Sequence, residues 1–598
     1  MHPTTQPSDA YESGVSTCQI QIIGCLAAAS LMLLAFAQAQ ARTWHVTPEP
    51  LAGIDPNGQT RSIREATEHV EAGDTILLHG GIYRETVMID ESGQFDQPIT
   101  MRAAEGERVV LTGADCIADW TPIPGEDRIF STRWPHRFIA WTRYNTHPDD
   151  EYHRLTGRCE QVFVNGYPLR QVLAKEQITR GTFFVDLVAR LLYVQPADNQ
   201  QLESGKAMVE ASTRDRMLTV KGNHVLVQGI RFRYAANRAQ QGAVAFSGDH
   251  VTVQDCIFEY TNSSGAEFTG KDITVRNCVF QHNGQLGFGA NHAHRFLMTG
   301  CTVRNNNTKG FDRGWEAGGD KICLTRGAIL EHSTFIENRG NGIWFDIGNE
   351  DCQVRNCRIA DNENAGIFYE ISYGLYAHDN VITGNGFAFT PGAWGAAAGI
   401  SLSSSPGCTI ERNLILGNKE GFNFREQVRT TPRIDGISEP VWNHDQIVCH
   451  NVLAWNRDAQ VWGWFDVSDE RHWPKAMRTA PQGGASPVAR PSSLEDLNLT
   501  FESNLYSPAP GQDLFNWGVT WKKWERYDNL DAVRKALSLD EGSEAAEFRV
   551  ADYAGLDLRV SADSPAVRMS CYPRGSAPGV QLGTLPQRLG SSTKTQSQ

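Results

Sequence analysis

A short phrase recurs along the middle of this chain, and its spacing limits what the chain can fold into. Each copy alternates apolar with polar residues, has Cys, Ser or Asn at its sixth position and is followed by an Asn a few residues later. The steps between successive sixth positions are 22, 23, 32, 24, 23, 33 and 38 residues. These positions are Cys256, Cys278, Cys301, Ser333, Cys357, Asn380, Asn413 and Asn451. Such self-similarity predicts a solenoid in which each repeat forms one coil.

The pattern inside each repeat favours strands over helices. Apolar residues alternate with polar ones, and Gly and Asn separate the short apolar runs, as in strands with one buried face. A β-sandwich does not explain a constant step with Asn at one turn, and a propeller blade needs about 40 residues. We therefore predict an all-β fold, a right-handed parallel β-helix, in which the longer steps carry loop insertions.

The rest of the chain divides around this repeat. Ser62-Ile-Arg-Glu65 has the form of a capping box and predicts a helix that caps the N-terminal end of the solenoid. Asn165-Gly166 predicts a hairpin turn, and 529–537 a short helix. The expected segments are a signal peptide at 1–41, an N-terminal cap and first coils at 42–112, an inserted small β subdomain at 113–215, the parallel β-helix core at 216–494, C-terminal coils and a cap at 495–573, and a disordered tail at 574–598.

Composition and the N-terminus limit location and partners. An almost unbroken apolar run at 22–37, followed by A-x-A sites, predicts an export signal, and the run is short for a membrane span. The net charge is −14, and about −12 without residues 1–41, which hold Asp9 and Glu12 and no Lys or Arg. This charge opposes nucleic-acid binding and mildly disfavours polyanionic glycans. We expect a secreted or periplasmic monomer without integral membrane association after signal cleavage.

The cysteines and the turn asparagines are interpreted as structural. Thirteen Cys become eleven without Cys18 and Cys25, an odd number. Four of them share the sixth position of the repeat, which favours a buried ladder of small side chains over disulfides. No C-x-x-C or Cys/His pattern supports zinc, so no metal or other cofactor is expected. Turn asparagines are expected to form a buried ladder that satisfies backbone groups; they are Asn277, Asn283, Asn338, Asn356 and Asn362.

Two carboxylates hold the same place in consecutive coils. Asp346 ends the stretch Gly342-Ile-Trp-Phe-Asp, and Glu370 ends Gly366-Ile-Phe-Tyr-Glu. Stacking these strands places the two side chains roughly 4.8 Å apart. Like charges that close need a compensating cation, a metal or a shared proton. A retaining glycosidase uses two carboxyl groups about 5 Å apart. We therefore predict Asp346 and Glu370 as a catalytic pair on an outward-facing polar stripe.

Further residues are predicted to line this stripe and bind substrate. Asn291 and Arg425, like the two acids, stand four residues after a Gly. Trp344 and Phe368 precede the acids by two and are expected to face outward and stack on sugar rings. The loop at 311–321 is expected beside the stripe. The predicted substrate-binding residues are Asn291, Trp315, Glu316, Lys321, Trp344, Phe368 and Arg425.

The segment around the two acids resembles a known family. Gly342-Ile-Trp-Phe-Asp346, followed by Phe368-Tyr-Glu370-Ile-Ser-Tyr, is similar to the active-site strands of the β-helical β-xylosidase family of glycoside hydrolases. The resemblance implies a retaining mechanism in which Asp346 is the nucleophile and Glu370 the acid/base. The long inserted jelly-roll domain of that family has no counterpart here, so substrate and chain-end preference do not transfer.

A second resemblance concerns the N-terminal part. Gly73-Asp-Thr-Ile, Gly81-Ile-Tyr-Arg and Pro98-Ile-Thr-Met-Arg look like polysaccharide lyases of the chondroitinase B type, which have a pectin-lyase-like solenoid. Glu316 and Lys321 have a spacing similar to a calcium-binding Glu and the base of those lyases, although Gly314 stands where they have a second acid.

Three functions follow from these observations. The first is a retaining glycoside hydrolase that acts on a neutral polysaccharide or its oligosaccharides, such as a xylan fragment, without a cofactor. The second is a polysaccharide lyase or uronan epimerase, in which Lys321 removes a proton while Glu316, Asp346 and Glu370 hold Ca²⁺. The third is a glycan-binding β-helix protein without catalysis.

Overall fold

The described residues are almost all β-structure. The computed structural model describes 41–49, 51–138, 155–198, 202, 205–388, 397–426, 429–465, 497–520, 524–574 and 577–583. The chain separates into two compact units, Met1–Arg42 and Thr43–Gln598, and the elements below belong to the second. The predicted signal peptide lies outside the described residues, apart from residue 41.

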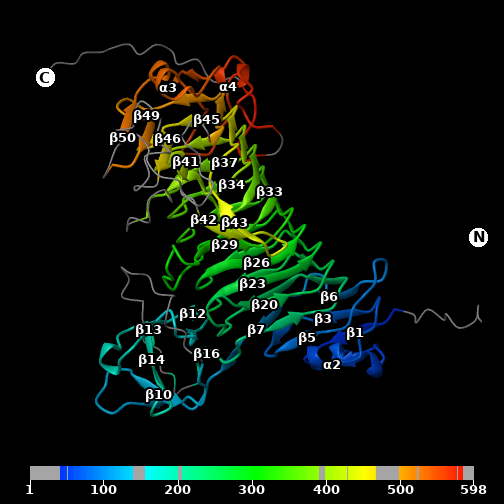
Figure 1. Cartoon of the computed structure of the whole chain (residues 1–598). Coiled ribbons are helices and arrows are strands. Elements are labelled where there is room, and N and C mark those ends of the chain that lie inside the picture. Colours follow the sequence, from blue (N-terminus) through cyan, green and yellow to red (C-terminus); the bar gives the residue numbers. More distant parts are fainter. Residues whose placement is uncertain are drawn as a thin grey trace, which may run out of the picture. The chain divides into compact units, whose positions relative to one another are not determined.

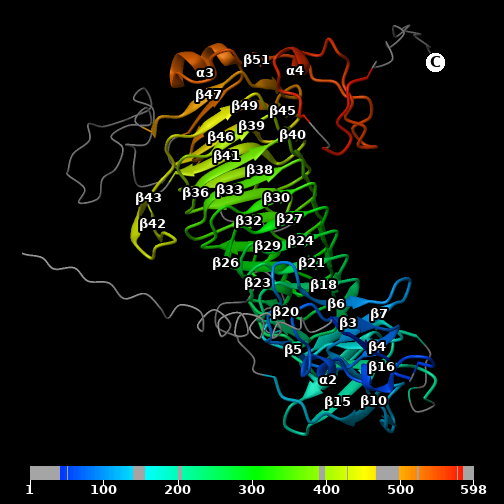
Figure 2. The same cartoon turned by 90° about the vertical axis from the view of Figure 1, so that its right-hand side faces the viewer.

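Three long sheets run through the second unit, and the chain visits them in turn, one strand of each per coil. Their strands are parallel except for the last pair of one sheet, Asp513–Gly518 and Trp524–Tyr527, which is antiparallel. Successive coils stack from β20 (Gly242–Phe246) to β46 (Ala459–Phe465) in Figure 1, and Figure 2 shows the same stack turned by 90°. The parallel strands predicted for the repeat are therefore present.

We call the sheets sheet 1, sheet 2 and sheet 3 and give their strands in spatial order. Sheet 1 contains β2 (Gln59–Thr60), β1 (Thr43–Val46), β3 (Thr75–Leu78), β6 (Ile99–Ala103), β18 (Val225–Gln228), β21 (Thr252–Gln254), β24 (Thr274–Arg276), β27 (Leu297–Thr299), β30 (Ile329–Glu331), β33 (Glu350–Arg355), β36 (Tyr373–His378), β39 (Thr409–Glu411), β44 (Ile447–Cys449) and β47 (Thr500–Glu502). Sheet 2 contains β4 (Gly81–Tyr83), β7 (Val109–Thr112), β19 (Ile230–Arg233), β22 (Ile257–Glu259), β25 (Val279–Gln281), β28 (Thr302–Arg304), β31 (Thr334–Ile336), β34 (Arg358–Ala360), β37 (Val381–Thr383), β40 (Leu414–Leu416), β45 (Val452–Ala454), β48 (Leu505–Ser507) and β51 (Glu544–Ala545). Sheet 3 contains β5 (Val87–Ile89), β17 (Leu218–Val220), β20 (Gly242–Phe246), β23 (Ser264–Lys271), β26 (Leu286–His294), β29 (Gly318–Cys323), β32 (Ile343–Phe345), β35 (Ile367–Glu370), β38 (Ala398–Ser403), β41 (Glu420–Glu426), β46 (Ala459–Phe465), β49 (Asp513–Gly518) and β50 (Trp524–Tyr527).

The sixth positions of the repeat form a buried column that joins the coils. The backbone N–H of Cys278 donates to the Cys301 sulfur at 3.4 Å, and the N–H of Cys301 donates to the Ser333 hydroxyl at 3.1 Å. Further along, the N–H of Cys357 donates to the side-chain oxygen of Asn380 at 3.0 Å. Cys, Ser and Asn are all suited to this position because the side chain of each supplies an acceptor to the preceding coil. All cysteines among the described residues are free, which confirms the ladder interpretation.

A second buried column consists of asparagines at one turn. Asn338 accepts from the backbone and the amide of Asn306, and its own amide donates to the Val303 carbonyl and to Asn362. The prediction of a structural Asn ladder is thus confirmed for Asn283, Asn338 and Asn362. It is wrong for Asn277 and Asn356, which are not fully buried and instead occupy left-handed turn positions with φ of 54° and 52°. Asn tolerates this conformation better than most residues.

Antiparallel strands interrupt the solenoid within the predicted insert. One sheet contains β12 (Tyr167–Pro168), β11 (Val162–Val164), β16 (Val209–Ser212) and β8 (Ala114–Cys116), and the other contains β13 (Arg170–Val172), β14 (Thr182–Asp186), β15 (Leu191–Gln195), β10 (Phe130–Arg133) and β9 (Thr121–Pro122), with β13 and β14 parallel. The hairpin of β11 and β12 turns at Asn165 and Gly166, with φ of 50° and 83°, as predicted from the Asn-Gly pair.

The remaining elements are short. Helix α2 (Ile63–Thr67) begins where the capping box predicted a helix, and the Ser62 hydroxyl accepts from the Glu65 N–H; its role as a cap stays a prediction. Helix α3 (Leu530–Leu537) was also predicted. The others are η1 (Pro56–Gly58), η3 (Lys175–Gln177), α4 (Pro565–Arg568) and the hairpin of β42 (Arg429–Pro432) and β43 (Ser438–Val441). Among the described residues no helix is long and apolar enough to span a membrane. Of the predicted disordered tail, 574 and 577–583 are described, and Leu582 forms a β-bridge with Val560.

Candidate active site

One register column of sheet 3 contains the predicted pair of acids. Asn291 pairs with Cys323 at its start, and Glu370 pairs with Ser403 further along. Phe345 pairs with Ile322 before it and with Tyr369 after it, so the residue that follows each of them lies in the same column. Asp346 therefore stands between Cys323 and Glu370, and neighbouring strands are about 4.8 Å apart.

The same column continues to Arg425, which pairs with Ser403. The column predicted from the Gly spacing is thus present, with one addition. Cys323 stands four residues after Gly319, in a coil whose strand the sequence interpretation took for a loop. Asn291 is exposed at the other end of the column.

Asp346 is buried against a lysine from the preceding coil. Its side chain is about nine-tenths buried, and Oδ2 lies 3.0 Å from Nζ of Lys321, whereas Oδ1 is buried without a hydrogen-bond partner. Burial raises the pKa of Asp346, and the charge of Glu370 raises it further, while the Lys321 ammonium opposes both. Nζ of Lys321 also donates to the Trp315 carbonyl at 2.9 Å.

Glu370 is held by two guanidinium groups. Nη2 of Arg425 donates to Oε1 of Glu370 at 2.9 Å, and Nη1 of Arg429 donates to the same oxygen. Nε of Arg425 donates to the Ser403 hydroxyl at 3.0 Å, which fixes the guanidinium along the column. Arg425 was predicted, and Arg429, on the β42–β43 hairpin, was not.

The two aromatic residues do not face solvent, so this part of the prediction is wrong. Trp344 is 2% exposed and Phe368 is 4% exposed, and together with Ala365 they form a small apolar cluster separate from the main core. Their ring centroids are 5.7 Å apart. Cations cover both rings: Nζ of Lys321 lies 4.4 Å from the Trp344 centroid, and the Arg425 guanidinium 5.8 Å from that of Phe368. The two rings therefore pack against the side chains of Lys321 and Arg425. A role of these rings in stacking on sugars stays a prediction.

The segment predicted as a loop beside the stripe is a strand in its second half. Lys321 lies on β29, and Trp315 and Glu316 precede that strand. Burial raises the pKa of Glu316, and the nearby charge of Lys321 lowers it. Nε2 of Gln240 donates to Oε2 of Glu316 at 2.6 Å. Glu316 is thus held near Lys321, but Lys321 forms its ion pair with Asp346.

Asp320 is an additional buried carboxyl behind the site. It occupies the inner face of β29, pairs in register with Phe288 and is completely buried. Oδ1 accepts the backbone N–H of Trp344 at 2.9 Å, and Oδ2 has no partner. Burial raises the pKa of Asp320 well above its usual range. Strands β29 and β32 share a single register pair, Ile322 with Phe345. The Asp320 carboxyl therefore takes the place of a backbone acceptor for the Trp344 N–H, next to Lys321 in the sequence.

The three acids of the calcium hypothesis do not form a cluster. In the described part of the chain, one group of three or more His, Cys, Asp or Glu side chains has its ligand atoms within 4.8 Å of one another, and it lies on sheet 1. Glu316, Asp346 and Glu370 are not such a group. The carboxylates of Asp346 and Glu370 are occupied by ammonium and guanidinium groups instead.

Comparison with known proteins identifies the architecture. A family model described as "Right handed beta helix region" matches residues 215–317 and 241–415. The solenoid is a right-handed parallel β-helix. This β-helix is similar to the structure of XylC in complex with xylose, with a TM-score of 0.61, 16% identity, and coverage of 80% of this chain and 86% of that chain. A structure described as "Glycoside hydrolase" has a TM-score of 0.47 at 13% identity, and the match covers 65% of this chain and 94% of that chain.

A full-length relative is also found. The protein named "Uncharacterized protein YwoF" from Bacillus subtilis (strain 168) is 23% identical over an alignment of 540 residues, and the match covers 86% of this chain and 90% of the relative. At these identities the structural likeness shows the β-helix fold alone, and the chemistry of the site has to be argued from its own residues.

Proposed function

We propose that this chain is an exported retaining glycoside hydrolase that acts, as a monomer, on a neutral polysaccharide or its oligosaccharides. The observation that carries the proposal is the placement of Asp346 and Glu370 at the same register position of consecutive coils. Two carboxyl groups one strand apart have the separation that a retaining glycosidase needs, about 5 Å. The proposal needs no metal or organic cofactor.

The proposed reaction takes two steps. Asp346 attacks the anomeric carbon while Glu370 donates a proton to the departing glycosidic oxygen, which gives a glycosyl ester on Asp346. Glu370, now a carboxylate, then removes a proton from a water molecule that attacks the same carbon and releases Asp346. These roles follow the resemblance of the two strands to the β-helical β-xylosidase family.

The charges around the pair place a condition on this cycle. Arg425 and Arg429 form ion pairs with Glu370, and burial raises the pKa of Asp346. For the proposed roles the proton has to be on Glu370 and the charge on Asp346 when the glycosidic bond breaks. Arg429 belongs to a separate hairpin, so its departure from Glu370 on substrate binding would allow this exchange, while Lys321 stays beside Asp346.

The lyase alternative is less well supported by the site. A general base must be neutral before it accepts a proton, but the carboxylates of Asp346 and Glu316 outweigh burial and raise the pKa of Lys321. The three acids that were to hold Ca²⁺ are not clustered. We therefore do not propose a uronate-cleaving reaction, and the experiment below tests for it.

The deciding experiment is an activity screen of the full chain without residues 1–41. Aryl β-glycosides, with xylosides first because XylC is described with xylose, and uronate polymers are incubated with and without EDTA. Aryl release that survives EDTA and is lost in Asp346→Asn and Glu370→Gln supports the proposal. An unsaturated uronate product that depends on Ca²⁺ would replace it with the lyase, and silence on all substrates would favour a binding protein.

Azide rescue tests the two roles separately. In the Glu370→Gln variant azide should intercept the glycosyl-enzyme and give a glycosyl azide that retains the configuration of the substrate. In the Asp346→Asn variant azide should attack directly and give the inverted product. The opposite pairing of variants and products would assign the acid role to Asp346.

A further inference from the structure

A second cluster of reactive side chains lies on sheet 1, away from the column of sheet 3. Glu411 ends β39 and Cys449 ends β44, and the two are register neighbours on adjacent coils. His450 follows directly, in a left-handed turn position with φ of 54°. One ligand atom from each of the three residues lies within 4.8 Å of the other two.

Two observations indicate that this cluster is incomplete as it stands. Nδ1 of His450 is buried and has no hydrogen-bond partner, although a buried imidazole nitrogen normally has one. The Cys449 thiol is free and 8% exposed, so it is shielded from solvent yet makes no disulfide. An ion between these side chains would satisfy both groups at once.

We propose that Glu411, Cys449 and His450 bind a divalent transition metal, with zinc as the best match. Thiolate, imidazole and carboxylate are the three ligand types that zinc prefers, and Ca²⁺ or Mg²⁺ would require oxygen ligands throughout. A tetrahedral site needs one more ligand. Glu502 is the next residue of the same column after Cys449 and is suited to this place, directly or through water.

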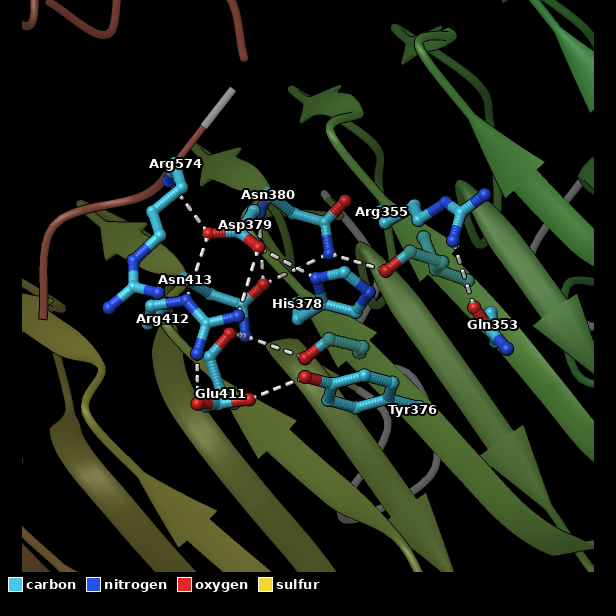
Figure 3. Close-up of polar contacts among 12 residues, drawn as sticks. Gln353, Arg355, Tyr376, His378, Asp379, Asn380, Glu411, Arg412, Asn413 and Arg574 are labelled. Atoms are coloured by element: carbon cyan, nitrogen blue, oxygen red, sulfur yellow. Dashed lines mark hydrogen bonds and ion pairs between the residues drawn. The ribbon is translucent and has the colours of Figure 1, made fainter. Parts of the chain in front are cut away.

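Neighbouring side chains already orient the carboxylate of Glu411, as in the second shell of many metal sites. Figure 3 shows Tyr376 and Arg412 on either side of it: the Tyr376 hydroxyl donates to Oε2 at 2.5 Å, and Nη1 of Arg412 contacts Oε1. Each oxygen has two lone pairs and thus keeps acceptor capacity for a metal. Nε of Arg412 also donates to Asp379 at 3.2 Å, which anchors the guanidinium.

The position of the cluster indicates a structural role for the metal. Asp379 accepts the backbone N–H of Arg574, so the segment after α4 is bonded to the residues that orient Glu411 (Figure 3). A metal that links β39 to β44 would stabilise these coils and the segment packed against them. It would leave the sheet 3 column unchanged, so the prediction is independent of the proposed hydrolase activity.

Cobalt titration of the full chain tests the proposal. Metal-free protein is titrated with Co²⁺ under reducing conditions, and absorption is followed in the near ultraviolet, where a cobalt–thiolate bond gives a charge-transfer band. We expect a stoichiometric band that Zn²⁺ bleaches, with a rise in the thermal unfolding temperature on adding Zn²⁺. Cys449→Ser should abolish the band, and His450→Gln should weaken Zn²⁺ binding by at least about 100-fold.

Two matched variants guard against adventitious binding. Cys116→Ser removes an exposed thiol, and His332→Gln replaces a histidine at the same left-handed turn position of an earlier coil. Both should leave the band unchanged. Circular dichroism of each variant checks that it is folded. Glu411→Gln removes the proposed carboxylate ligand and should also weaken Zn²⁺ binding. Absence of the band in the parent chain, or its survival in a folded Cys449→Ser protein, would overturn the proposal.

Discussion

Lys321 and Asp346 come from consecutive coils, and Nζ of the lysine lies 3.0 Å from Oδ2 of the aspartate. Both side chains are about nine-tenths buried, so solvent screens this ion pair only weakly. The lysine supplies the positive charge that two stacked carboxylates require. It also lies over the ring of Trp344, which fixes the direction of the ammonium group.

Removal of this lysine should shift the acidic limb of the pH profile. Lys321 is the strongest influence that lowers the pKa of Asp346, and the proposed nucleophile has to be charged. In Lys321→Met the pKa of Asp346 should rise, and the acidic limb of kcat/KM should move to higher pH by about one to three units. Lys271→Met, at an exposed strand end, is the matched control. An acidic limb that stays in place would argue against Asp346 as the nucleophile.

Arg429 should affect substrate binding instead. Arg429→Ala removes an ion pair with Glu370 that the proposed cycle has to break when substrate binds, so KM should fall by about two- to fivefold. Arg433→Ala is a control on the same hairpin, because Arg433 binds Glu350 and Glu439 instead. If both variants behave alike, the effect comes from the hairpin and not from contact with Glu370.

Asp320 should make the folded protein less stable as the pH rises. Burial raises its pKa, so the native state keeps a proton that the unfolded chain loses above about pH 3.9. The free energy of unfolding therefore falls with increasing pH until the folded carboxyl ionises, with a slope of up to about 1.4 kcal/mol per pH unit. Asp320→Asn keeps an oxygen for the Trp344 N–H and should remove this slope.

Urea denaturation at several pH values measures that effect. Asp90→Asn, at an exposed carboxyl, should leave the pH dependence as it is. A parent chain and an Asp320→Asn variant with equal slopes would show that the buried carboxyl is not protonated.

The asparagine ladder should be sensitive at its buried members and tolerant at its turns. Asn338→Leu removes the acceptor of Asn306 and the donor to Val303, and should cost about 3 kcal/mol or more, because buried polar groups lose their partners. Asn356→Gly should change stability by no more than about 1 kcal/mol, because Gly adopts the left-handed turn readily. Denaturation midpoints of the two variants provide the comparison.

The repeat made the solenoid and the acid column predictable because both depend on local spacing. A fixed step and a Gly four residues ahead place Asp346, Glu370 and Arg425 in one column. Cys323 obeys the same spacing after Gly319 and was accessible to that reasoning. It was missed because the Gly-rich segment around it has the composition of a turn.

Other features depend on contacts that no local pattern encodes. Arg429 reaches Glu370 from a hairpin that belongs to no repeat, and the burial of Trp344 and Phe368 depends on side chains from other coils. The Cys449–His450 pair has no metal-binding motif of its own, because Glu411 is supplied by the previous coil. Stacking, and not sequence proximity, brings these groups together.

The buried amide columns have a polarity along the solenoid axis. In each, the backbone N–H of one asparagine donates to the side-chain oxygen of the asparagine in the following coil. The side-chain amides also donate to backbone carbonyls of the preceding coil, as from Asn380 to Val354 and from Asn418 to Ile382. At the ends of the two columns, the backbone N–H of Asn504 donates to the Ser543 hydroxyl and that of Asn456 to the Gln460 side chain, so neither column continues with another asparagine. Strands β48 and β49 still stack on β45 and β46 beyond Asn456, so the number of coils is not limited by the length of this amide column.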